Sequence, residues 1–215
     1  MVLVLSATSD PSSDGLASQT STAAYYELNA AEYVSRTINA DISELYQPFL
    51  SLLPDASKIL DVGCGAGRDL KEFKNRGFRP YGIDSSPALA HYAHLNSGAP
   101  VEPLRVEDVT FRDEFEGIWA CASLLHLPKR QFSPVLIVLK RALKDQGVIF
   151  ISVQEGIGEV TMDDGRFFAF YNLSELIEKV SASGLRIQNS WRTMDKLQGR
   201  SDVHWINILA RKSPD

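Results

Sequence analysis

Three glycines spaced two residues apart, Gly63, Gly65 and Gly67, follow directly on a short apolar run, residues 58–62. Glycine lets the backbone approach a ligand closely and adopt positive φ angles that other residues avoid. The helix expected after the glycines exposes backbone N–H groups at its start, and these attract negatively charged or electron-rich ligand atoms. The spacing therefore indicates a loop that holds a ligand through its backbone. A tight turn that only packs strand on helix is the alternative.

The residues around the glycines separate the nucleotides that such a loop could bind. A dinucleotide-binding G-x-G-x-x-G fingerprint would place its third glycine at Arg68. The loop also lacks the lysine and the serine or threonine of a phosphate-binding P-loop. A nicotinamide-dependent oxidoreductase is therefore disfavoured. An acid, Asp61, stands just before the glycines instead.

Two further acids stand where a nucleoside could be bound. Asp84 ends the second predicted strand, about 20 residues after the loop, where a carboxylate can accept hydrogen bonds from both hydroxyls of a ribose. Asp108 follows the third predicted strand and is placed to accept from an exocyclic adenine amine. Small residues in the stretch WACAS, 119–123, leave room for a ligand beside them.

Alternating strands and helices must position these residues. Apolar residues at helical spacing predict two amphipathic helices within 23–53, and the run 58–62 predicts a parallel strand buried on both faces. Strand and helix patterns then alternate as far as a helix over 172–183, and two strands close the chain. Parallel neighbours need crossover connections, so this order predicts an α/β fold with helices on both faces of a mostly parallel sheet. The short connection between the last two strands predicts an antiparallel hairpin at one edge.

Four motifs, in combination and in order, resemble those of class I S-adenosylmethionine-dependent methyltransferases. They are ILDVGCGAGRD, YGIDSS, VEDV and FEGIWACASLLHLP, and the resemblance covers about residues 25–212. It implies a Rossmann-like sheet of seven strands with the last strand antiparallel, and S-adenosyl-L-methionine as the cofactor. One departure is Glu116, which stands where the family often begins its fourth strand with an aspartate.

The resemblance also implies roles for single residues. The three glycines would pack against the cofactor, and Asp84 would bind its ribose. Asp108, together with the amide of Val109, would read adenine, and Asp61 would lie near the methionine moiety. The full set of cofactor-binding candidates is Asp61, Gly63, Cys64, Gly65, Gly67, Arg68, Asp84, Ser85, Asp108, Val109, Ala120, Tyr33 and Arg36.

Arg68 and the N-terminal helices are expected to complete the cofactor site. The guanidinium of Arg68 forms a fork that matches the methionine carboxylate, with a solvated first-turn position as the alternative. Residues 1–22 are rich in Ser, Thr, Asp and Gly and predict a flexible tail before a methyltransferase domain over 23–215. In similar small enzymes the N-terminal helices cover the cofactor, so we expect residues 23–53 to form a lid.

Methyl transfer from a sulfonium is an in-line displacement, in which the protein mainly aligns donor and acceptor and excludes water. A general base is needed only when the acceptor is protonated, and His126 is the candidate for it. A packing or lining role is the alternative for His126. The substrate candidates are Tyr26, His126, Arg166, Phe168 and Tyr171, and a hairpin that plugs the end of the sheet is the alternative for the segment that holds the last three.

Composition limits the partners. The net charge of −5 disfavours an electrostatic grip on nucleic acid or an anionic membrane. Two cysteines outside any CxxC pair suggest a reducing compartment without a metal site, and the absence of a long apolar stretch favours a cytoplasmic protein. Signatures of nucleobase methylation are missing, so the expected acceptor is a small molecule methylated at O, N or S. A protein epitope and a non-catalytic module acting through protein partners are the alternatives.

Overall fold

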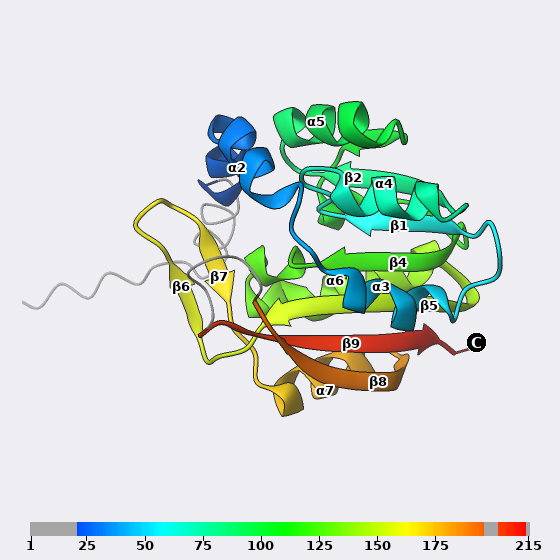
Figure 1. The fold of residues 1–215 in the computed structure, drawn as a ribbon. Coiled ribbons are helices and arrows are strands. Elements are labelled where there is room, and N and C mark those ends of the chain that lie inside the picture. The colour runs from blue at the N-terminus through cyan, green and yellow to red at the C-terminus, as the bar shows by residue number, and fades with distance from the viewer. Residues whose placement is uncertain (1–20, 196–201, 214–215) are drawn as a thin grey trace, which may run out of the picture.

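The computed structural model describes residues 21–195 and 202–213 of the chain. Within these ranges a seven-stranded sheet runs in the order β3-β2-β1-β4-β5-β9-β8, and a two-stranded hairpin, β6-β7, stands at one end of it (Figure 1). The strands are β1 (Lys58–Val62), β2 (Arg79–Asp84), β3 (Val101–Pro103), β4 (Phe115–Cys121), β5 (Leu143–Gln154), β6 (Glu159–Thr161), β7 (Phe167–Ala169), β8 (Leu185–Met194) and β9 (His204–Lys212).

The directions of the strands confirm the predicted fold class. β1 pairs in parallel with β2 and β4, β2 with β3, and β4 with β5. β9 pairs antiparallel with both β5 and β8, so the last strand is the one that runs against the others. The expected antiparallel pair lies at one edge of the sheet, with β8 outermost.

Helices cover both faces of the sheet. They are α2 (Ala30–Thr37), α3 (Ser43–Leu50), α4 (Arg68–Asn75), α5 (Pro87–Ser97), α6 (Lys129–Ala142) and α7 (Leu173–Ala182), with short 3-10 turns η1 (Val106–Asp108) and η2 (Leu124–His126). Alternate strand residues point to opposite faces: Leu60 packs with residues of α6 and α7, while Ile59 packs with residues of α3 and α4. Each fully buried side chain of this kind stabilises the fold by roughly 1.5–3 kcal/mol.

A further helix, residues 21–28, precedes α2 and is here called the cover helix. Residues 21 and 22 of the expected tail belong to this helix, and the remainder of that tail lies outside the described residues. α3, by contrast, packs into the core through Tyr46 and Phe49. No helix within the described ranges is long and apolar enough to cross a membrane.

Candidate functional site

The loop after β1 is built so that only glycine fits at two of its positions. Gly63 and Gly67 have φ angles of 69° and 77°, in the left-handed region that side chains disfavour. A Cβ atom on Gly63 would lie 2.5 Å from Cβ of Ser123, and one on Gly67 would lie 2.6 Å from the carbonyl oxygen of Ala93. The loop is therefore packed between the end of β4 and α5, with the Tyr33 ring close to Gly65.

Asp84, at the end of β2, is tied to this loop. Its Oδ2 accepts a 2.9 Å hydrogen bond from the N–H of Gly65, and its Oδ1 accepts one of 2.9 Å from the N–H of Ser86. The side chain is buried, and burial raises the pKa of the carboxyl to about 6. Asp84 therefore brings an acceptor group with remaining lone pairs to the carboxyl edge of the sheet.

A cavity of about 300 Å³ opens between the loop, the end of β2 and the cover helix. Seven of the residues proposed from the sequence line it: Tyr26, Tyr33, Gly63, Gly65, Asp84, Ser85 and His126. The other lining residues are Thr22, Ala23, Val62, Ile83, Leu89, Leu104, Arg105, Val106, Glu107, Ala122, Ser123, Leu124 and Leu127. Loop, second acid and N-terminal aromatic residues thus meet at one site.

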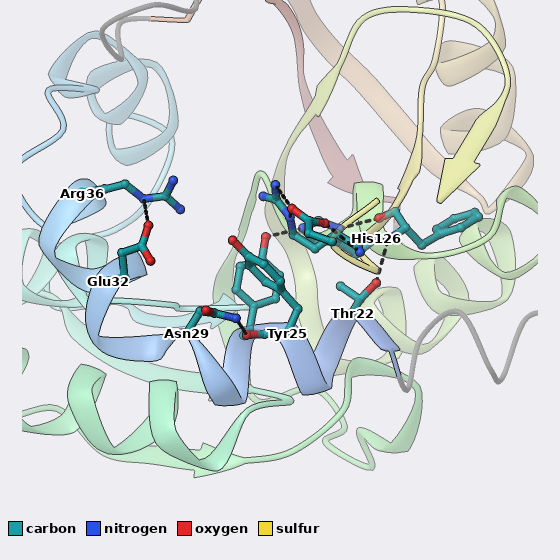
Figure 2. Close-up of polar contacts among 10 residues, drawn as sticks. Thr22, Tyr25, Asn29, Glu32, Arg36 and His126 are labelled. Carbon is teal, nitrogen blue, oxygen red and sulfur yellow. Dashed lines mark hydrogen bonds and ion pairs between the residues drawn. The ribbon is translucent and has the colours of Figure 1, made fainter. Parts of the chain in front are cut away.

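The cover helix closes this cavity and is fastened at both of its ends. Near its start, Oγ1 of Thr22 accepts a 2.8 Å hydrogen bond from the N–H of Phe167 in β7. Near its end, Oε2 of Glu27 accepts hydrogen bonds from the Ser86 hydroxyl (2.6 Å) and from the N–H of Ala88 (2.9 Å), at the start of α5. Figure 2 shows Thr22 and Tyr25 on this helix with His126 facing it.

His126 and Tyr26 join the cover helix to η2. Nδ1 of His126 lies 2.7 Å from the carbonyl oxygen of Phe167, and a carbonyl only accepts, so Nδ1 carries the hydrogen. Nε2 therefore accepts the 2.9 Å hydrogen bond from the Tyr26 hydroxyl. Burial lowers the pKa of His126 to about 4, and the nearby charge of Arg166 acts in the same direction. The imidazole is neutral at pH 7, and its lowered pKa makes it a weak base.

Arg68, at the start of α4, is held by its neighbour Asp69. Nε and Nη2 of Arg68 donate to the two carboxylate oxygens of Asp69 at 2.6 and 3.1 Å. The same carboxylate accepts from the Tyr46 hydroxyl at 2.7 Å and from Nε1 of Trp119 at 2.9 Å. Asp69 is buried, and the Arg68 guanidinium is the main influence that lowers its pKa against the cost of burial. Arg68 is thus a fixed group of a buried network rather than a solvated first-turn residue.

Two buried polar atoms near the loop have no hydrogen-bond partner in the described part of the chain. They are Oδ2 of Asp61, at the end of β1, and Oγ of Ser123, whose Cβ packs beneath Gly63. Burial raises the pKa of Asp61, with the charge of Asp69 adding to the effect. Buried polar atoms are nearly always paired, so these two mark places where a bound group would supply a partner.

The structure does not bring Asp108 to the cavity. Asp108 ends the 3-10 turn η1 and is exposed, and the N–H of Val109 already donates to the carbonyl of Val106. The turn directs Leu104, Arg105, Val106 and Glu107 to the cavity wall instead, with Glu107 paired to Arg105 at 2.8 Å. The cavity wall is therefore formed by residues one to four positions before Asp108, and the adenine contacts of Asp108 and Val109 stay a prediction. No periodic signal in the sequence marked this turn.

Other candidates also lie outside the cavity wall. Arg36 is exposed and lies 4.0 Å from Glu32 (Figure 2), Ala120 is buried in the core, and Tyr171 is fully buried against Phe132. Cys64 and Gly67 shape the loop from behind rather than line the cavity. Arg166 and Phe168 are not among the lining residues either: Arg166 packs on the rings of Tyr25 and Phe168, and Phe168 contacts His126.

Known proteins share both the sequence of the loop region and the fold. Residues 59–147 match a family of methyltransferase domains. The Bacillus subtilis protein YqeM, provisionally named a methyltransferase, is 29% identical over 121 residues, which are 52% of this chain. The chain spans about half, 49%, of the length of that relative.

Solved structures extend the likeness to nearly the whole chain. The Burkholderia thailandensis 1,6-didemethyltoxoflavin N1-methyltransferase, solved with 1,6-didemethyltoxoflavin and S-adenosylhomocysteine, superposes with a TM-score of 0.77 at 20% identity, over 98% of this chain and 94% of that one. A Haloferax volcanii protein, provisionally assigned as a methyltransferase and solved with the activator Trm112, gives 0.72 at 14% identity, over 90% and 98%. The chain has the class I methyltransferase fold, with a methyltransferase domain matched over residues 59–147.

The cofactor of these methyltransferases, S-adenosylmethionine, fits the residues present. The bare loop offers backbone to it, Asp84 offers acceptor oxygens for ribose hydroxyls, and the cavity has an apolar side for a purine, formed by Ile83, Leu104 and Val106. The unpartnered oxygens of Asp61 and Ser123 could accept hydrogen bonds from its charged methionine end. The ribose and the methionine end of the cofactor therefore have complementary polar groups at this site, and the purine has an apolar wall.

Proposed function

We propose that this methyltransferase transfers the methyl group of S-adenosylmethionine to an oxygen, nitrogen or sulfur atom of a small-molecule acceptor. The observation that carries the proposal is the cavity of about 300 Å³, which joins the loop and Asp84 to Tyr26 and His126 under the cover helix. A space of this size, bounded by a fastened helix, suits a small acceptor rather than an extended polymer. The Burkholderia protein, a 1,6-didemethyltoxoflavin N1-methyltransferase solved with 1,6-didemethyltoxoflavin, supports the same proposal.

The cofactor brings the chemistry, since its sulfonium makes the methyl group electrophilic. The residues of the chain bind, orient and exclude water. Gly63, Gly65 and Ser85 hold the cofactor from the loop side, and Asp84 binds the ribose. Arg68, fixed by Asp69, keeps a positive charge near the site of the methionine carboxylate. An in-line displacement then needs only an acceptor held on the opposite side of the methyl group.

The cover helix and α2 would act as the lid, because Tyr26 and Tyr33 line the cavity from them. The lid is shorter than the sequence indicated, since α3 is a core helix. Closing it over both reactants excludes water, which would otherwise compete for hydrogen bonds and weaken electrostatic interactions.

His126 would orient the Tyr26 hydroxyl and would not become a stable imidazolium. Its Nε2 accepts from the Tyr26 hydroxyl, and its low pKa disfavours the imidazolium at neutral pH. The hydroxyl oxygen of Tyr26 keeps lone pairs that can accept a hydrogen bond from an O–H or N–H acceptor. An acceptor that must lose a proton would pass it along this pair only transiently, and the proton would then leave to solvent.

The test has two stages. Isothermal titration should show binding of S-adenosylhomocysteine to the folded protein, and the absence of binding would exclude the cofactor. A screen of small phenols, amines, carboxylic acids and thiols should then yield at least one acceptor-dependent formation of S-adenosylhomocysteine. Binding without turnover on any small molecule, together with methylation of a protein from a lysate, would favour the epitope alternative.

A second candidate is a methyltransferase-fold module that works through a protein partner. The Haloferax relative, which was solved with an activator protein, is the observation in its favour. A chain of this kind would bind the cofactor and show no turnover until the partner is added. Methylation of a small acceptor by the isolated chain would exclude it.

A further inference from the structure

One part of the cavity, formed by the cover helix and the turn η2, has a distinct character. Thr22, Ala23, Tyr26, Leu124, His126 and Leu127 line this part, here called the acceptor end. None of these six residues is acidic, whereas the acidic residues Asp84 and Glu107 line the part formed by β2 and η1. His126 is neutral at pH 7 because of its low pKa. The acceptor end therefore has no negative charge of its own.

Further aromatic rings pack against Tyr26 and His126, the two rings that line the acceptor end. The ring of His126 lies 5.3 Å from that of Tyr26 and 4.8 Å from that of Phe168, both in edge-to-face geometry. Tyr25 adds a further ring 5.4 Å from Tyr26, and Phe170 stacks on Phe168 at 6.2 Å. Rings arranged in this way favour a flat aromatic guest, which gains stacking and edge contacts that an aliphatic guest does not.

One cation stands beside these rings. The guanidinium of Arg166 lies 4.6 Å from the ring centre of Tyr25 and 5.4 Å from that of Phe168, so it bridges the cover helix and β7. It is also close enough to the Tyr26 hydroxyl to lower the pKa of that group against the effect of burial. The Arg166 side chain is 23% exposed, so its charge is in reach of solvent rather than buried in the core.

Asp164 pairs with Arg166, but only one of its carboxylate oxygens accepts from the guanidinium. Nε and Nη2 of Arg166 both donate to the single atom Oδ2 of Asp164, at 3.0 and 2.6 Å. Oδ1 of Asp164 instead accepts from the backbone N–H of Arg166. The Asp164 side chain is 36% exposed, and a solvated ion pair of this kind contributes little stability. A ligand carboxylate that engages both arms of the fork can therefore compete with Asp164.

We propose that the acceptor is an aromatic acid, whose ring packs against Tyr26, His126 and Phe168 and whose carboxylate binds Arg166 in place of Asp164. The inference rests on the proposed function and names the substrate class of the same site. An anionic acceptor also complements the positive charge of the cofactor's sulfonium. Arg166 is then the residue that determines specificity, and Asp164 is the internal group that the substrate displaces.

The test compares three ligands that differ mainly in charge. 4-Hydroxybenzoate, 4-hydroxybenzamide and 4-hydroxybenzylamine are titrated into the protein saturated with S-adenosylhomocysteine, with binding followed by ligand-observed NMR and calorimetry. We expect the benzoate to bind about ten-fold more tightly than the amide, as one charge-assisted hydrogen-bonded pair would give, and the amine to bind most weakly. Equal affinities, or a preference for the amine, would overturn the inference. Binding of S-adenosylhomocysteine is measured first, so a failure of the cofactor half is seen separately.

Variants separate recognition from a structural role of Arg166. Arg166→Gln should abolish the preference for the benzoate, and Arg166→Lys should retain part of it. Asp164→Asn should tighten the benzoate several-fold, because the competitor for the fork is lost while the amide is unaffected. If Arg166 only fastened the cover helix, Asp164→Asn would leave the benzoate affinity unchanged or weaken all three ligands alike, and the inference would fail. Arg192→Gln is the matched control. It breaks an exposed pair between Arg192 on β8 and Glu155, and it should leave the affinities for all three ligands unchanged.

Discussion

The N–H of Gly65 donates a 2.9 Å hydrogen bond to Oδ2 of Asp84, which fixes the loop after β1 to the end of β2. Both groups line the same cavity, so the acid proposed to bind the ribose also holds the backbone proposed to face the rest of the cofactor. A change at Asp84 therefore affects two parts of the site at once.

Asp84→Ala should weaken the binding of S-adenosylhomocysteine by about ten- to hundred-fold, because ribose hydroxyls lose a charged acceptor and the loop loses an anchor. Isothermal titration gives the affinity. Asp55→Ala, an exposed acid before β1 at the opposite end of that strand, is the control and should bind like the parent protein. Equal affinities for the two variants would show that Asp84 does not contact the cofactor.

Two glycines with similar φ angles should respond differently to alanine. Gly67→Ala places Cβ 2.6 Å from the Ala93 carbonyl oxygen, whereas Gly77→Ala meets nothing within 4 Å. The left-handed backbone alone lowers the free energy of unfolding by roughly 1–2 kcal/mol in both variants. The clash at position 67 lowers it by about 1–3 kcal/mol more. Urea denaturation measures both. Equal losses in the two variants would mean that α5 moves freely away from the loop.

The buried carboxylate of Asp69 should be far more important to stability than an exposed one on the same helix. Asp69→Ala leaves the guanidinium of Arg68 without its partner and should lower the free energy of unfolding by about 3–5 kcal/mol. Glu72→Ala removes a partly exposed pair with Arg76 and should cost at most about 1 kcal/mol. Chemical denaturation of both variants at pH 7 tests the contrast. A small loss at Asp69 would contradict the network.

His126 should make stability depend on pH. Its pKa is about 4 in the folded protein, against 6.5 for a solvated histidine in the unfolded chain, so the unfolded chain binds the extra proton first as pH falls. Stability should therefore be lost between pH 6.5 and pH 4, by roughly 2–3 kcal/mol, and His126→Gln should remove this loss. His91→Gln, on the exposed side of α5, is the control. An unchanged slope in His126→Gln would show that the imidazole is not neutral when buried.

Asp84 acts in the opposite sense over part of the same range. Its folded pKa of about 6 lies above the ordinary value of 3.8, so the folded protein holds a proton that the unfolded chain has released. In the ligand-free protein, stability should fall as pH rises from about 4 to 6, and Asp84→Asn should abolish that fall. Unfolding curves of His126→Gln and Asp84→Asn, each compared with the parent at the same pH, separate the contributions of the two groups to stability. A parallel course for Asp84→Asn and the parent would contradict the raised pKa.

The sequence predicts what local spacing determines. The glycines, the acid at the end of β2 and the strand–helix alternation lie within short segments, and the class of fold follows from them. Asp108 lies in η1, a single 3-10 turn, and such a turn has no periodic pattern to predict which of its neighbouring residues faces the cavity. Which residues of this turn line the cavity therefore depends on local turn geometry, which the sequence pattern does not predict.

Contacts between distant segments could not be predicted in the same way. Tyr26 and His126 are separated by 100 residues, and the carboxylate of Asp69 meets Tyr46 and Trp119 from two other elements. Asp69 is next to Arg68 in the sequence, yet only the structure shows that its carboxylate accepts the Arg68 hydrogen bonds that we expected a cofactor carboxylate to accept. Burial, which sets the pKa of His126, is likewise a property of the whole fold.

The position of β9 has a consequence for how the chain is synthesised. β8 pairs only with β9 in the sheet, and β9 lies between β5 and β8. While the ribosome is still making residues 204–212, β8 has no strand to join and the edge of β5 is bare. The sheet can therefore be completed only after this segment has left the exit tunnel, so the joining of β8 to the sheet waits for β9.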